Sequence, residues 1–192
     1  MKEKLSVKDL INIGIFSAIY IVVMMAIVTA MGTIPIFYLV APFFVGIGCA
    51  SVYMLMAMRV RKPGVALILS IMLALLFTSM NWMASLFAIF CGLVAEWILN
   101  TAGRQNEAGI RKSFLAMSCA TTGPYLGIVF MKQTFIDSTA LYYGQEYAVK
   151  LDALTPTWIV FAIAGLAVLG ALVGNKFAKR VLGKHFKKAG IV

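Results

Sequence analysis

Nine aromatic, hydroxyl and amide side chains lie near the ends of apolar segments in this 192-residue sequence. Aromatic rings can stack on a flat molecule, and hydroxyl and amide groups can hydrogen-bond to its polar edges. We therefore expect these residues to bind a small polar organic solute. The nine are Tyr38, Asn81, Trp82, Thr121, Thr122, Tyr125, Tyr142, Tyr143 and Trp158.

Pro124 interrupts an apolar segment beside three of these candidates. Because proline has no amide hydrogen, the carbonyl of Ala120 loses its usual partner in an α-helix. Thr121, Thr122 and Gly123 add polar groups next to that carbonyl. Backbone of this kind can line a binding cavity, or neighbouring helices can satisfy a simple kink. The sequence leaves both interpretations open.

The sequence offers no catalytic constellation. Its one histidine, His185, lies in a basic tail, and no G-x-x-x-x-G-K-[ST] phosphate-binding loop occurs. We therefore predict a protein that is not an enzyme, with no catalytic residue, metal or cofactor. Glu96 is the one acid well inside an apolar segment. It either forms a structural ion pair with a basic loop residue or couples transport to an ion.

The composition indicates a chain that needs lipid as its solvent. Hydrophobic residues make up 62% and charged residues 12%, and the mean hydropathy is +0.94. Since about 20 residues are needed per crossing, six short helices nearly exhaust the chain. We predict one all-α integral membrane domain over residues 1–192. Its six transmembrane helices are expected at about 10–31, 36–58, 65–79, 83–99, 113–131 and 157–177, with an external loop or lid at 132–156.

The charges predict the orientation. Of the 17 Lys and Arg residues, all but Lys132 and Lys150 fall in the tails and loops of one side, and the other side carries Asp137, Glu146 and Asp152. By the positive-inside rule both termini are cytoplasmic and the protein lies in the cell membrane. Topology thus explains the net charge of +10 better than a nucleic-acid partner does.

Three of the nine candidates have a second interpretation in a membrane. Trp82, Trp158 and Tyr38 can form an aromatic belt at the membrane–water interface, which needs no ligand. Asn81 and Tyr125 are less easily explained in this way.

Small residues recur at four-residue spacing, which lets helix backbones approach closely. Packing within the chain is the default explanation, and docking against another membrane subunit is the alternative for the first span. The pairs are Gly14 and Ala18, Ala26 and Ala30, Gly123 and Gly127, and Gly170 and Gly174.

Four local motifs resemble one family of membrane proteins. They are Leu5-Ser6-Val7-Lys8-Asp9-Leu10-Ile11, Asn81-Trp82, Gly92-Leu93-Val94-Ala95-Glu96, and the ending Lys184-His185-Phe186-Lys187-Lys188-Ala189-Gly190-Ile191-Val192. With these motifs the sequence resembles, over nearly its whole length, the substrate-specific S components of energy-coupling factor (ECF) transporters, and among them the Trep_Strep subfamily.

The resemblance implies an S-component-like bundle that binds a vitamin or similar small organic micronutrient outside the cell. It also implies docking on a transmembrane T component driven by two ATPase subunits. In that family small residues of the first helix form the docking surface, which corresponds here to Gly14 and Ala18. The binding loops correspond to 32–35, 79–82 and 132–156. Nickel and cobalt are disfavoured, because the N-terminal region has no histidine.

Two other functions stay open from the sequence. One is a stand-alone ion-coupled secondary carrier, in which Glu96 would be the coupling residue. The other is a membrane assembly subunit that transports nothing.

Overall fold

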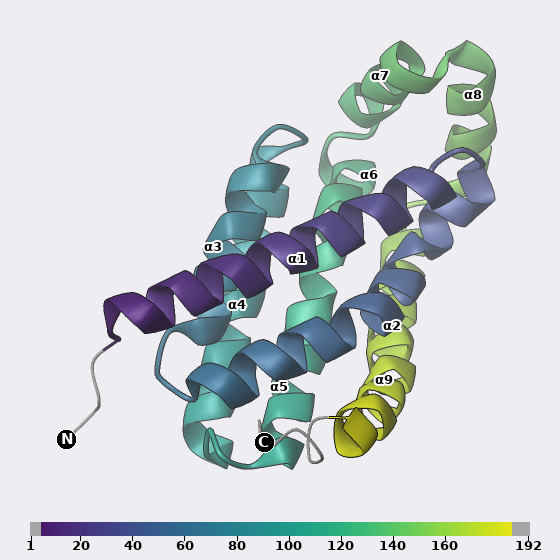
Figure 1. Ribbon diagram of the computed structural model, residues 1–192. Coiled ribbons are helices and arrows are strands. Elements are labelled where there is room, and N and C mark those ends of the chain that lie inside the picture. Colours follow the sequence, from purple (N-terminus) through teal and green to yellow (C-terminus); the bar gives the residue numbers. More distant parts are fainter. Residues whose placement is uncertain (1–4, 186–192) are drawn as a thin grey trace.

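The computed structural model describes residues 5–185, with side chains through residue 182, and is helical throughout (Figure 1). Within this part of the chain, five helical segments are long and apolar enough to cross a membrane. They are α1 (Val7–Met31), α2 (Pro35–Val60), α4 (Trp82–Ala102), the composite segment Glu107–Phe130, and α9 (Ile159–His185).

The shorter helix α3 (Val65–Phe77) packs antiparallel against α4. Its 13 residues span about 20 Å at about 1.5 Å per residue, which is less than a hydrocarbon core of about 30 Å. The turn that follows satisfies its own polar groups. The Thr78 and Ser85 hydroxyl oxygens lie 2.9 Å apart, and both contact the Ala74 carbonyl, at 2.9 and 2.8 Å. Such bonding lowers the cost of placing a turn below the membrane surface.

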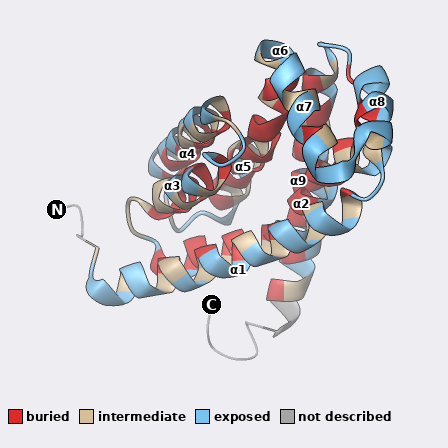
Figure 2. Cartoon of the chain, turned by 90° about the horizontal axis from the view of Figure 1, so that it is seen from above, coloured by how far each residue is buried: buried red, intermediate tan, exposed pale blue. Residues whose placement is uncertain are grey.

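Glycines allow α2 and α9 to pack backbone against backbone. A Cβ atom added to Gly170 would lie 2.0 Å from the Phe43 carbonyl oxygen, and one added to Gly174 would lie 2.4 Å from that of Gly46. No residue with a side chain fits these contacts, which confirms close packing within the chain for the pair Gly170 and Gly174. The buried residues lie between packed helix pairs, chiefly α2 with α9, α3 with α4, and α4 with α5, whereas the outer side of α1 is largely exposed (Figure 2).

The fifth and last helices extend beyond the ranges expected from hydropathy. The fifth segment begins at Glu107, where we expected residue 113, because the Asn106 side chain accepts a hydrogen bond from the Ala108 amide at 2.9 Å and caps a polar first turn. It comprises α5 (Glu107–Cys119), the 3₁₀ helix η1 (Ala120–Leu126) and α6 (Gly127–Phe130). Helix α9 continues past residue 177 to His185, since lysine and arginine are good helix formers and favour a helix C-terminus.

Residues 132–156 form two short helices beyond α6, at the end of the bundle away from the basic loops (Figure 1). They are α7 (Lys132–Tyr143) and α8 (Gln145–Leu154), joined at Gly144, whose φ of +91° favours glycine. An ion pair of 2.8 Å between Lys132 and Asp152 links the start of α7 to α8. The Tyr147 hydroxyl donates to the Gly32 carbonyl at 2.8 Å, which holds α8 against the α1–α2 turn.

The contact between α2 and α9 predicts a large effect for a single methyl group. In Gly170→Ala the new Cβ meets backbone, so the two helices must separate, and we expect the free energy of unfolding to fall by about 1–3 kcal/mol. Gly165→Ala on the same helix is the control, because nothing lies within 4 Å of its Cβ position. Thermal unfolding of the purified proteins in detergent measures both, and equal midpoints for the two variants would contradict the packing described.

Candidate solute-binding site

A cavity of about 100 Å³ lies between α1, α2, the α3–α4 turn and η1, at the end of the bundle that carries α7 and α8. Its wall is mostly apolar, and among the described residues no charged side chain lines it. Its polar groups come from serine, threonine and tyrosine. The lining residues are Met24, Met25, Val28, Tyr38, Pro42, Val45, Leu76, Phe77, Ser79, Met80, Thr121, Pro124 and Tyr125.

The segment around Pro124 forms one wall of this cavity. The chain winds as a 3₁₀ helix there, in accord with the break predicted at proline. Thr121 lines the cavity, and its hydroxyl donates to the Ser118 carbonyl at 2.7 Å. Thr122 is buried, and its hydroxyl oxygen has no hydrogen-bond partner within residues 5–182. Both threonine oxygens keep lone pairs that can accept a further hydrogen bond.

Asn81 supports the cavity wall without lining it. Its side-chain oxygen accepts from the Ala84 amide at 2.7 Å and caps α4, and its amide group donates to the Pro124 carbonyl at 3.2 Å. A Cβ on Gly123 would lie 3.0 Å from the Ala84 carbonyl oxygen, so η1 and the start of α4 are in close contact. Asn81 therefore holds the α3–α4 turn and η1 together on either side of the cavity.

Four tyrosines extend from the cavity wall to α8. Tyr38 and Tyr125 line the cavity, Tyr143 is the last residue of α7, and Tyr147 lies in α8. The rings of Tyr38 and Tyr125 have centroids 5.0 Å apart, and the Tyr125 hydroxyl donates to the Tyr38 carbonyl at 2.6 Å. Tyr143 and Tyr147 stack at 4.7 Å with an angle of 20° between their rings. Burial raises the pKa of Tyr147 to about 12, so its phenol is neutral and donates at physiological pH. Tyr147 was not predicted as a site residue, although it belongs to the same tyrosine-rich segment as Tyr142 and Tyr143.

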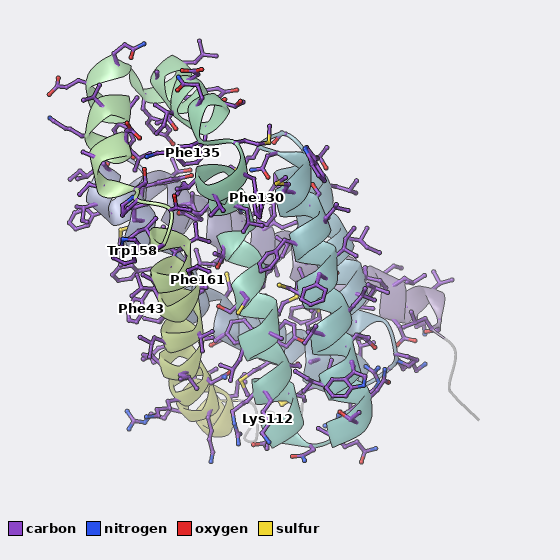
Figure 3. All side chains as sticks on the ribbon, turned by 180° about the vertical axis from the view of Figure 1, so that it is seen from behind. Phe43, Lys112, Phe130, Phe135, Trp158 and Phe161 are labelled. Atoms are coloured by element: carbon purple, nitrogen blue, oxygen red, sulfur yellow. The ribbon has the colours of Figure 1, made fainter. Side chains whose placement is uncertain are left out.

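The remaining aromatic candidates do not come together at the cavity. Trp82, Tyr142 and Trp158 are exposed and none lines it. Figure 3 shows Trp158 at the start of α9, at the periphery of the bundle. This placement favours the aromatic-belt interpretation for the two tryptophans.

Glu96 lies at the opposite end of the bundle from the cavity, in a hydrogen-bonded network. Its carboxylate accepts from the Gly64 amide at 2.6 Å and the Ala66 amide at 3.1 Å, which satisfies the start of α3. Arg104 forms an ion pair with the same carboxylate. Arg104 also donates to the Lys62 carbonyl at 2.8 Å. The carboxylate thus caps a helix and neutralises a partly buried arginine.

The outer side of α1 presents small residues with no partner in the described chain. Nothing lies within 4 Å of a Cβ added to Gly14, and Ala18 is exposed one turn later. Ile15 and Ile19 flank them and are exposed as well. Of the five long apolar segments, α1 is also the least buried.

The apolar wall of the cavity was not predicted from the sequence. Met24, Val28 and Phe77 contribute to it, yet they resemble the lipid-facing residues of the same helices in type. Only the packing of α1 against α2 and α3 distinguishes them.

Residues 7–188 match a family model described as a hypothetical bacterial integral membrane protein, Trep_Strep. No curated protein and no solved structure matches the chain. The family description agrees with the five apolar helical segments found between residues 5 and 185. The chain therefore belongs to the Trep_Strep family of bacterial integral membrane proteins.

Proposed function

We propose that the chain is the substrate-binding S component of an ATP-driven micronutrient importer in the cell membrane. It would capture a small organic solute outside the cell and dock on a T component driven by two ATPase subunits. The observation that carries this proposal is the uncharged cavity enclosed by α1, α2, the α3–α4 turn and η1 beneath the tyrosines of α7 and α8.

The distribution of charge supports an outward-facing cavity. Lys132 and Lys150 are the only two of the 17 basic residues in the sequence that fall in the segment at the cavity end. The positive-inside rule then assigns the opposite end, with both termini, to the cytoplasm. A cavity on the outer side is where an importer must capture its solute.

Six crossings follow if α3 is counted with the five longer segments. It begins at the basic loop 61–64, and the turn after it, at Ser79 and Met80, lines the cavity. A short helix of this kind is accommodated when its polar turn is internally hydrogen-bonded or faces a cavity.

The lining indicates the class of solute. Apolar side chains dominate, and the polar groups are neutral hydroxyls such as those of Ser79 and Thr121. Such a wall suits an uncharged, partly apolar organic molecule better than an ion, which would be left without a compensating charge. Sites for drug-sized ligands measure about 300–1,000 Å³, so a cavity of about 100 Å³ must widen when a vitamin-sized solute binds.

The open face of α1 supports a docking role. Gly14 and Ala18 form a shallow strip on which another transmembrane helix can approach closely. The T component would bind there, and its two ATPase subunits would supply the energy of ATP hydrolysis.

The geometry at Glu96 argues against the stand-alone carrier. A coupling carboxylate must exchange its ion during transport, whereas this one is engaged by two backbone amides and Arg104. It also lies away from the cavity. An assembly subunit without a solute would leave the cavity unexplained.

Blocking the cavity is expected to abolish solute binding. Val28 lines the cavity, whereas Val22 lies on the same helix with 66% of its surface exposed. We expect Val28→Trp to lower the amount of co-purified organic solute by about tenfold or more, equivalent to a loss of about 1.4 kcal/mol in affinity. Native mass spectrometry of the purified proteins measures the bound solute. Val22→Trp should retain it, and equal occupancy in the two variants would refute the site.

Docking is expected to depend on the open face of α1. Since Gly14 has space around it, Gly14→Leu should fold and bind solute normally but fail to co-purify with co-expressed T component and ATPases. Gly165→Leu, at another glycine with nothing within 4 Å, serves as the control and should assemble. An intact complex with Gly14→Leu would show that this face is not the docking surface.

A further inference from the structure

A second hollow lies at the basic end of the bundle, between α5 and α9. It is a groove of about 490 Å³ that opens to the surface of the protein. Lys112, which lines the groove, lies at the lower end of α5 in Figure 3. The solute cavity lies at the other end and shares no lining residue with this groove.

Four basic side chains converge on the groove from two helices. Arg111 and Lys112 come from the first turns of α5. Lys176 and Lys179 are three residues apart on α9 and therefore share one side of it. Arg111 pairs with Glu107 at 3.6 Å. Within residues 5–182 the three lysines have no carboxylate partner. Cations gathered around one groove repel one another, and an anion that binds among them removes this repulsion.

Asn175 supplies a buried acceptor in the same groove. The residue is only 5% exposed, and its side-chain amide donates to the Arg111 carbonyl at 3.1 Å. That bond fixes the orientation of the side chain and leaves its oxygen, Oδ1, buried without a partner within the described chain. A buried carbonyl without a hydrogen bond is costly. Oδ1 is closed to solvent in this structure, so a ligand hydroxyl would satisfy it once the ligand widens the groove between α5 and α9.

The rest of the lining is apolar and distinguishes between sources of the anion. Leu115 lies one turn after Arg111 on α5 and Leu172 one turn before Lys176 on α9, so both are nearer the middle of these helices than the cations are, and Leu172 is exposed. A free phosphate ion would leave these side chains uncovered, whereas the acyl chains of a lipid would cover them. Basic pockets between transmembrane helices at the cytoplasmic side are also where acidic lipid headgroups bind.

We propose that this groove is a binding site for an anionic glycerophospholipid with a hydroxylated headgroup, of the phosphatidylglycerol type. The phosphate lies between Lys112, Lys176 and Lys179, and a headgroup hydroxyl donates to Oδ1 of Asn175. The acyl chains follow the apolar surface of α5 and α9. The lipid thereby neutralises the cluster and anchors the basic end of the bundle to the inner leaflet.

The test uses the purified full chain in detergent and titrates it with phosphatidylglycerol, phosphatidylcholine or inorganic phosphate. Native mass spectrometry measures how much of each ligand is bound. We expect selective binding of phosphatidylglycerol that millimolar phosphate does not displace. A triple variant, Lys112→Ala with Lys176→Ala and Lys179→Ala, should bind it about a hundredfold more weakly, since each lysine contributes about fivefold. The three lysines are exposed, so folding should be retained.

The matched control removes the same charge elsewhere at the basic end. Lys8→Ala, Arg59→Ala and Arg180→Ala together change exposed residues that do not line the groove, and they should leave the affinity within a few-fold of the parent protein. Equal losses of affinity in the two triple variants would show that net charge alone determines binding, and would overturn the proposal. Displacement by inorganic phosphate would overturn the assignment to lipid.

Asn175 has its own readout, which does not depend on the lysines. Asn175→Ala should lose the preference for phosphatidylglycerol over phosphatidic acid, which lacks the headgroup hydroxyls, while still binding both. An unchanged preference would exclude the hydrogen bond to Oδ1. Because the solute cavity is untouched, solute occupancy should be the same in all these variants, so the outcome is independent of the importer proposal.

Discussion

The packing of the basic end of the bundle depends on the contacts of the Glu96 carboxylate. This carboxylate accepts hydrogen bonds from the Gly64 and Ala66 amides and pairs with Arg104, so it joins α3, α4 and the α4–α5 loop. Lys62 extends the network, because its ammonium group contacts Asp9 of α1 at 2.8 Å. In a low-dielectric setting such charge-assisted bonds are strong, and removal of one partner would leave others unsatisfied. This end is therefore held as a unit.

The opposite end is joined mainly by uncharged contacts. An ion pair links α7 to α8, but the bonds that bridge the elements around the cavity are neutral hydrogen bonds, from Asn81 to η1, from Tyr125 to α2 and from Tyr147 to the α1–α2 turn. Uncharged contacts of this kind can separate and reform at low cost when a solute enters. One end that stays fixed and another that can open suit a protein that binds a solute on one side and a partner complex elsewhere.

Hydropathy and charge were sufficient to predict an all-helical membrane protein, because long apolar helices and basic loops leave a clear signal in sequence. Pro124 likewise predicted a break in the α-helix, and the chain leaves the α-helical form there, at η1. The apolar wall of the cavity was not predictable. Val28 and Val22 are the same residue type on the same helix and differ only in what their side chains face. The pairing of Glu96 with backbone amides 30 and 32 residues away also depends on how α3 and α4 fold together, which residue type alone does not encode.

The sidedness of the bundle is the claim that can be tested most directly. In a chain whose Cys49, Cys91 and Cys119 are replaced by alanine, single cysteines are placed at Ser138 on α7 and at Gln105 in the α4–α5 loop, both exposed positions. Intact cells are then treated with a membrane-impermeant maleimide. We predict labelling of Ser138→Cys in intact cells and of Gln105→Cys only after permeabilisation. The reverse pattern would place the cavity at the cytoplasmic end of the bundle and contradict the proposal of an importer.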